Sequence, residues 1–279
     1  MKFGIFYEHQ LPKPWDEGLE LQLFQDALEQ VELADRIGID YAWEVEHHFL
    51  EEYSHSSAPE IFLAAASQRT KNIRLGHGII VFPGGVGTAE EILYLLGILL
   101  HPDNADMEFP VVFTGPASAA EYFQRIDEFL VYTLGESVRE LYQIIIDDPE
   151  AVALAMCVGI DRLTLFRRDN DDAFYFNWRL NIPLEFQQPF EPTHEAMASL
   201  DLSPNQPVHQ LAANLRRAFS GIVAGNVKEQ GIHAIEQHGP YRLHAPGELM
   251  THLDELLKAF VEQHRMKLPG SHYEPCYAL

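Results

Sequence analysis

The sequence predicts an α/β fold in which a parallel sheet of Rossmann-like βα units precedes a mainly helical C-terminal section. Short apolar runs typical of buried strands alternate with helix-periodic stretches up to about residue 160. Such alternation is typical of parallel βαβ units. A glycine-rich turn at residues 83–87 joins one apolar run to a helix, as anion-binding βα turns do. Beyond residue 168 the alternation stops, and two amphipathic helical stretches follow.

The first 80 residues are predicted to form strand, helix, strand, helix and strand. The predicted ranges are 2–7, 21–37, 41–45, 59–68 and 73–82. Apolar residues at helical spacing define the first helix, and Gly38 provides its stop. Pro59 opens the second helix, where a missing N–H does no harm.

The alternation continues after the glycine-rich turn. We expect helices over 92–100 and 121–134 and strands over 110–115 and 143–148. Because the pattern is unbroken, it predicts one parallel sheet from residue 2 to about residue 160. A charged break at 167–172 marks the next boundary. The predicted parts are 1–80, 81–168 and 169–279, the last with an irregular, proline-rich stretch and helices over 209–219 and 248–264.

Composition limits the classes of partner. The 279 residues carry a net charge of −23, which disfavours binding to nucleic acids and anionic membranes. Cys157 and Cys276 are far apart in sequence and suit a reducing compartment. The N-terminus has no signal-peptide pattern, and the longest apolar run, Ile92–Leu100, is too short for a bilayer of ~30 Å. We therefore expect a cytoplasmic protein without nucleic-acid or membrane partners.

The run Pro83-Gly84-Gly85-Val86-Gly87-Thr88-Ala89-Glu90-Glu91 carries the strongest functional signal. Glycines let the backbone turn tightly and approach a ligand closely. Unpaired N–H groups at the start of the following helix favour an anion such as phosphate. The alternative is structural, because Thr88 and Glu91 have the spacing of a capping box.

The motif Pro-Gly-Gly-x-Gly-Thr-x-x-Glu is similar to that of the lysine decarboxylase-like, or LOG, family of nucleoside-monophosphate hydrolases. Residues 79–279 resemble the C-terminal part of nucleosidases in this family. The resemblance is carried by residues 101–106, 175–178, 188–192, 211–228 and 265–270. It implies hydrolysis of nucleoside 5′-monophosphates to free base and ribose 5-phosphate, without a cofactor and in a homo-oligomer.

The same resemblance implies roles for residues of the motif. Glu91 would be catalytic, acting on an oxocarbenium-like sugar and the attacking water. Glu90 is either a nucleotide-binding residue or a solvated side chain that supports the helix dipole. The phosphate would be bound by Gly84, Gly85, Gly87 and Thr88.

The front section resembles a different family. Residues 1–6, 43–49 and 67–76 are similar to the start of bacterial-luciferase-like flavin monooxygenases. This implies a TIM barrel, an FMN cofactor and a flavin-site role for His47, although about three of the barrel's eight βα units are present. A flavin-dependent monooxygenase is therefore the alternative function.

The two resemblances meet at residues 77–80, so we interpret the sequence as a chimera. The nucleosidase family has an upstream glycine-rich segment and an arginine that complete its site, and neither is found before residue 79. A third alternative is therefore an inactive chimeric α/β protein.

Three further groups have both a functional and a structural interpretation. Glu46, His47 and His48, with Glu51, Glu52 and His55, match no standard metal-site spacing, so no metal is predicted. Arg216, Arg217 and Lys228 could bind an anion, but ion pairs with the many carboxylates are favoured. The aromatic residues of 174–178 are expected to pack, with stacking on a base as the alternative.

Overall fold

The structure, a computed structural model, describes residues 3–45, 54–56, 59–76, 79–170, 181–182, 186, 190–266 and 275–278. The chain divides into two compact units, Met1–Ile79 (unit 1) and Ile80–Leu279 (unit 2). Parallel strands joined through helices in both units confirm the predicted α/β class. Within the described part of the chain, no helix combines the length and apolar character needed to cross a membrane.

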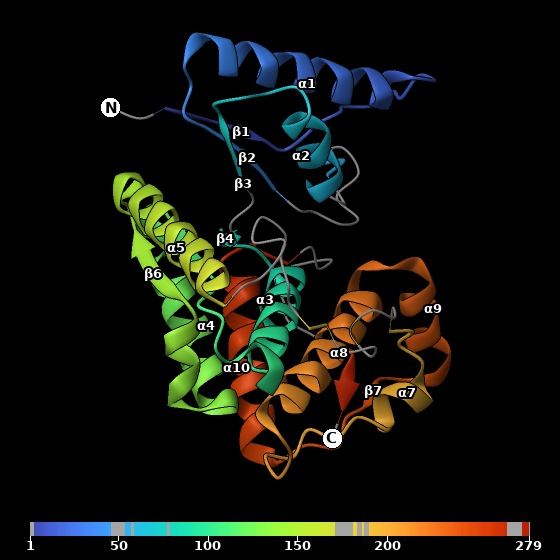
Figure 1. The fold of residues 1–279 in the computed structure, drawn as a ribbon. Helices are drawn as coiled ribbons and strands as arrows, with labels where there is room; N and C mark the ends of the chain where they lie inside the picture. The colour runs from blue at the N-terminus through green and yellow to red at the C-terminus, as the bar shows by residue number, and fades with distance from the viewer. Residues whose placement is uncertain are drawn as a thin grey trace. The chain divides into compact units, whose positions relative to one another are not determined.

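Unit 1 is a three-stranded parallel sheet with two helices (Figure 1). Its elements are β1 (Gly4–Tyr7), α1 (Leu19–Ile37), β2 (Tyr41–Glu44), α2 (Pro59–Ser67) and β3 (Arg74–Gly76). The strand order β1-β2-β3 follows the sequence. Val31 and Ala34 of α1 and Phe62 of α2 bury against Ala42 of β2, which places both helices on one face of the sheet. As predicted, α1 ends at Gly38, whose φ of 87° suits a residue without a Cβ.

Asp35 on α1 fixes the chain that leads into β3. Its carboxylate accepts hydrogen bonds from the backbone N–H groups of Lys71, Asn72 and Ile73 at 3.0, 2.7 and 2.6 Å. The Ile73 hydrogen bond is the largest cause of a lowered pKa for Asp35, because it favours the ionised form. Asp35 thus has a structural role.

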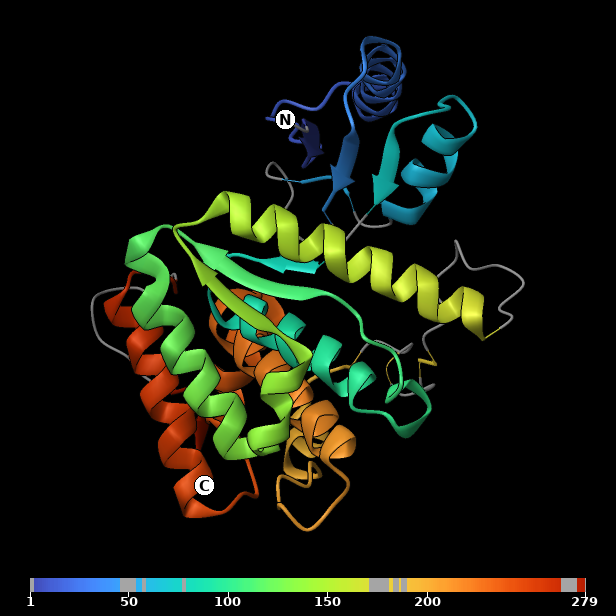
Figure 2. The same ribbon diagram turned by 60° about the vertical axis from the view of Figure 1, so that its left-hand side comes forward.

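Unit 2 is built around a second three-stranded sheet, whose first strand begins at the boundary between the two units. Its strands, β4 (Ile79–Val81), β5 (Val111–Gly115) and β6 (Gln143–Ile146), lie in that order. In Figure 2 the yellow-green α5 (Pro149–Asp169) runs along one face, and α3 (Val86–Leu99) and α4 (Ala120–Leu134) lie on the other. Phe113 of β5 and Phe123 of α4 are fully buried and stack with ring centroids 5.5 Å apart, so the core lies between this face and α4.

The predicted single sheet is wrong. The expected strand 73–82 is two strands, and β3 pairs with β2 whereas β4 lies beside β5 in the other sheet. The physical signal is in the sequence, because Gly76 and Gly78 interrupt the apolar run and glycine weakens a strand interior.

The C-terminal section is mainly helical, as predicted. Its elements are α7 (His194–Ala198), α8 (Val208–Val227), α9 (Glu229–His238), β7 (Tyr241–Arg242), α10 (Gly247–Glu262) and β8 (Tyr277–Ala278). The long helix α8 packs along α3, and α10 packs against α4 (Figure 1). Both helices therefore cover the layer that carries the glycine-rich turn. The boundary expected near residue 169 stays a prediction, because residues 171–180 lie outside the described residues.

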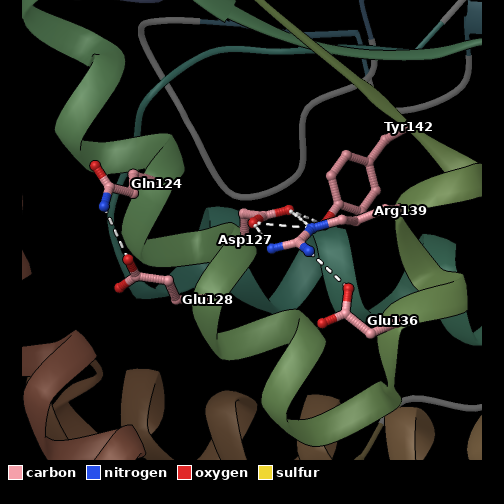
Figure 3. Close-up of polar contacts among 6 residues, drawn as sticks. All are labelled: Gln124, Asp127, Glu128, Glu136, Arg139 and Tyr142. Carbon is pink, nitrogen blue, oxygen red and sulfur yellow. Dashed lines mark hydrogen bonds and ion pairs between the residues drawn. The ribbon is translucent and has the colours of Figure 1, made fainter.

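A group of charged residues attaches α4 to the 3₁₀ segment that follows it (Figure 3). Arg139 donates to both carboxylate oxygens of Asp127, with Nη2 2.6 Å from Oδ2 and Nε 3.1 Å from Oδ1. The Tyr142 hydroxyl donates to the same carboxylate at 2.8 Å, and Glu136 accepts from Arg139 at 2.6 Å. The Arg139 hydrogen bonds lower the pKa of Asp127. This cluster explains the local fold and leaves Asp127 saturated with protein donors.

Candidate functional site

The glycine-rich turn connects β4 to α3. Gly85 is the N-cap of α3 in extended backbone, and no side chain caps the helix. The predicted capping box is therefore wrong, because the helix begins at Val86 and Thr88 already lies inside its first turn. The N–H groups of Val86, Gly87 and Thr88 have no acceptor within the helix. The turn therefore presents the backbone donors that an anion requires.

The glycines of the turn differ in what surrounds them. A Cβ at Gly84 would overlap the Thr88 hydroxyl, and a Cβ at Gly85 would overlap the backbone carbonyl of Arg265. Packing within the chain therefore explains why Gly84 and Gly85 are glycines. A Cβ at Gly87 would meet nothing within 4 Å. Gly87 consequently leaves open space beside the first turn of α3.

Glu91 lies on the same open face. Residues four apart share one face of a helix, so Glu91 follows Gly87 one turn further along α3. Glu91 is exposed. A carboxylate thus stands next to the open space that Gly87 creates, about one helical pitch (~5.4 Å) from the backbone donors.

Arg265, which follows α10, holds the turn from the other side. Its Nη1 donates to the Pro83 carbonyl at 3.0 Å, and its own carbonyl lies against Gly85. Its guanidinium carbon lies 4.8 Å from the centroid of the Tyr122 ring on α4. Residues from three distant parts of the chain therefore meet at the turn.

Tyr122 is 1% exposed. Burial raises the pKa of its hydroxyl to about 12, so the group stays protonated at neutral pH. The Gly84 backbone and the Arg265 guanidinium oppose this rise, and the Glu91 carboxylate adds to it. The hydroxyl therefore lies in the electrostatic environment of the turn.

Glu90 lies on a different face of α3 from Glu91 and faces α8. Its carboxylate is 3.9 Å from Nη1 of Arg216, and the two side chains are 22% and 13% exposed. Burial raises the pKa of Glu90, while Ser220, Arg216 and Lys228 oppose the rise. The interpretation of Glu90 as a solvated side chain is wrong, and its role in nucleotide binding stays a prediction.

Arg216 is the α8 partner in this ion pair with Glu90. Its guanidinium carbon is 5.4 Å from the centroid of the Tyr94 ring. Burial lowers the pKa of Arg216, and Glu90 acts in the opposite direction. The favoured prediction for the basic group is confirmed for Arg216, which pairs with a carboxylate, while Arg217 donates to Asn214 at 3.1 Å.

We predict that Arg216→Met and Glu90→Gln each destabilise unit 2 by about 1–3 kcal/mol, because each leaves a largely buried partner uncompensated. The double variant should recover most of the loss, since both desolvated charges are then gone. Urea unfolding of the four proteins measures the coupling. Strictly additive losses would show that the pair does not act as a unit.

Several predicted residues lie outside the described residues. These are His47 of the flavin interpretation, the remaining loop residues Glu46, His48, Glu51 and Glu52, and the aromatic residues of 174–178. His55 of the same group is described, and its Nδ1 is 2.9 Å from a carboxylate oxygen of Glu20. Among the described residues, no group of three or more metal-ligating side chains comes together.

Sequence reasoning missed the roles of Tyr122 and Arg265 at the turn. Tyr122 lies in an amphipathic helix and looks like an ordinary core residue, while Arg265 is 182 positions from the Pro83 carbonyl that it contacts. Local spacing carries no signal for either contact. Only the packing of α4 and α10 brings these residues to α3.

Two family models match the chain. The model described as possible lysine decarboxylase matches residues 34–156, which include the turn, α3 and Tyr122. The model described as the C-terminal part of pyrimidine/purine nucleotide monophosphate nucleosidase matches residues 160–279, which include Arg216 and Arg265. The first match begins before the expected junction at residues 77–80 and runs across it.

Individual relatives match different shares of the chain. The pyrimidine/purine nucleotide 5′-monophosphate nucleosidase of Escherichia coli (strain K12) is 58% identical over 207 residues, 74% of this chain and 46% of that protein. The 4-hydroxyprotoasukamycin monooxygenase of Streptomyces nodosus subsp. asukaensis is 39% identical over 83 residues, 30% of this chain and 21% of that protein. The limonene 1,2-monooxygenase of Rhodococcus erythropolis is 41% identical over 84 residues, 29% of this chain and 20% of that protein.

The chain thus spans less than half the length of the nucleosidase that it matches and a smaller share of each monooxygenase. The nucleosidase match is both longer and higher in identity. Over most of its length, this chain is similar to the LOG-type pyrimidine/purine nucleotide 5′-monophosphate nucleosidases.

Proposed function

We propose that this chain hydrolyses the N-glycosidic bond of nucleoside 5′-monophosphates, giving free base and ribose 5-phosphate. The observation that carries the proposal is the open face of α3. There, backbone donors, the space beside Gly87 and the exposed Glu91 follow one another along a single helix. The similarity to nucleotide monophosphate nucleosidases supports the same reaction.

In this proposal the phosphate binds the N–H groups of Val86, Gly87 and Thr88, at the positive end of the helix dipole. The ribose then lies above Gly87, where a side chain would obstruct it. Glu91 stabilises the positive charge that develops on the sugar and orients the attacking water. No cofactor or metal takes part in this step.

Base release is the experiment that tests the proposal. The purified chain should release base from AMP, GMP, CMP or UMP, with ribose 5-phosphate formed in equal amount, as chromatography and a sugar-phosphate assay would measure. Absence of release from all four would refute hydrolysis by this chain. A bound-flavin absorbance after addition of FMN would instead favour the monooxygenase alternative, which the two partial matches support.

The proposed compartment follows from the cysteines, and the proposed oligomeric state follows from the resemblance to nucleosidases. Cys157 and Cys276 are both free, which suits the reducing cytoplasm. A homo-oligomer is proposed from the nucleosidase resemblance. The junction near residue 79 remains our proposal for a chimera, supported by the change of sheet between β3 and β4.

A further inference from the structure

We propose that the Tyr122 hydroxyl is a ligand-binding group of the anion site, where it donates a hydrogen bond to a phosphate oxygen at the N-terminus of α3. This inference rests on the proposed function, because it adds a residue from α4 to the same site. It assigns a role to a side chain that the motif Pro83–Glu91 does not contain.

The first argument is the state of the hydroxyl. Tyr122 is 1% exposed, and its hydroxyl lies beside the Gly84 backbone N–H but has no acceptor for its own proton among the residues that the structure describes. Buried hydroxyl groups in folded proteins are nearly always hydrogen-bonded, because an unmade bond leaves the desolvation of the group uncompensated. An acceptor that comes from a bound ligand satisfies this requirement.

The second argument is location. A hydrogen bond from the Gly84 backbone and the charges of Arg265 and Glu91 all act on the Tyr122 hydroxyl. Arg265 also holds the Tyr122 ring in place. Its guanidinium lies over the ring, and its Nη1 donates a hydrogen bond to the Pro83 carbonyl. The hydroxyl is therefore fixed at the glycine-rich turn.

The chemistry of the donors selects a phosphate oxygen as the acceptor. The hydroxyl remains protonated at neutral pH, so it can donate. The N–H groups of Val86, Gly87 and Thr88 are donors as well, and α3 is 14 residues long, so its dipole favours negative charge. Several donors that converge on one place fit a group with several anionic oxygens, and hydrogen bonds to such oxygens are strong.

Tyr241 offers a matched comparison within the chain. It is 0% exposed, and its hydroxyl has no hydrogen-bond partner among the described residues. Its surroundings differ, because its ring lies 4.7 Å from His194 and its pKa is raised by burial and by Cys276. Tyr241→Phe therefore removes a buried hydroxyl like that of Tyr122, but away from the glycine-rich turn.

The experiment compares the wild-type chain with Tyr122→Phe and Tyr241→Phe. Calorimetry measures the binding of inorganic phosphate, ribose 5-phosphate, AMP and, as an uncharged control, adenosine. We expect Tyr122→Phe to weaken binding of the three phosphate-bearing ligands roughly 10- to 100-fold, as for a lost hydrogen bond to a charged group. Tyr241→Phe should bind them like wild type. The melting temperature of Tyr122→Phe without ligand should fall no further than that of Tyr241→Phe, because each variant removes one buried hydroxyl.

Three results would overturn the inference. The first is equal phosphate affinity in wild type and Tyr122→Phe, which together with a lowered melting temperature would assign the hydroxyl to folding. The others are equal losses of affinity in the two variants and no phosphate-dependent binding in wild type. Binding is read without turnover, so a wild type that binds phosphate through Tyr122 but releases no base refutes hydrolysis and supports the inference.

Discussion

Glu91→Gln should lower the rate of base release by at least about 100-fold, the lower range for loss of a general acid–base group. The amide keeps the shape and hydrogen bonding of the side chain but removes its charge. The positive charge on the sugar in the transition state then loses its stabilisation. Because the phosphate is bound by the first turn of α3, AMP affinity should stay within about threefold of wild type. Steady-state kinetics and calorimetry measure the two quantities.

Glu128→Gln is a suitable control for this variant. Glu128 lies on α4, is exposed, and accepts a hydrogen bond from Gln124 at 2.9 Å. Its loss removes the same charge from the same unit without touching α3. Turnover by Glu91→Gln at the wild-type rate would show that Glu91 is not the catalytic carboxylate.

The elements that the sequence predicted correctly have local causes. Gly38 ends α1 because its positive φ needs no Cβ, and Pro59 opens α2 because the first turn needs no N–H from it. The motif also predicted a turn between a strand and a helix, although α3 begins at Val86 and the predicted helix covered only 92–100. Each of these signals is contained within a few residues, so an isolated sequence shows it.

The predictions that failed depended on partners far away in the sequence. An apolar run over 73–82 looks the same whether it forms one strand or two, and only pairing with β2 or proximity to β5 distinguishes them. The capping box failed because Thr88 lies against Gly84 instead of capping the helix. No sequence signal near Gly85 predicts its contact with the Arg265 carbonyl, because the packing of α10 brings these two residues together.

The glycines of the turn allow packing and ligand binding to be separated. Gly85→Ala should destabilise unit 2 by about 1–3 kcal/mol, because its Cβ would overlap the Arg265 carbonyl and force backbone to shift. The same shift should weaken the Arg265 contact with Pro83. Urea unfolding measures the first effect. An unchanged free energy of unfolding would show that the backbone at Arg265 can shift without destabilising the unit.

Gly87→Ala should not destabilise the chain in the absence of ligand, in contrast to Gly85→Ala. No atom lies within 4 Å of the new Cβ, and alanine is preferred in helices by roughly 0.5–1 kcal/mol, so stability should stay the same or rise. Binding of AMP should nevertheless weaken by about tenfold or more, because the methyl group occupies the space assigned to the ribose. Calorimetry with AMP measures this loss.

Gly247→Ala provides the matched control for helix propensity. Gly247 opens α10, and its Cβ would also meet nothing within 4 Å. It should gain stability like Gly87→Ala and leave AMP binding unchanged. If Gly87→Ala binds AMP as tightly as Gly247→Ala does, no ligand approaches Gly87 and the ribose lies elsewhere. If only Gly87→Ala loses affinity while both keep their stability, the open space beside Gly87 is required by the ligand and not by the fold.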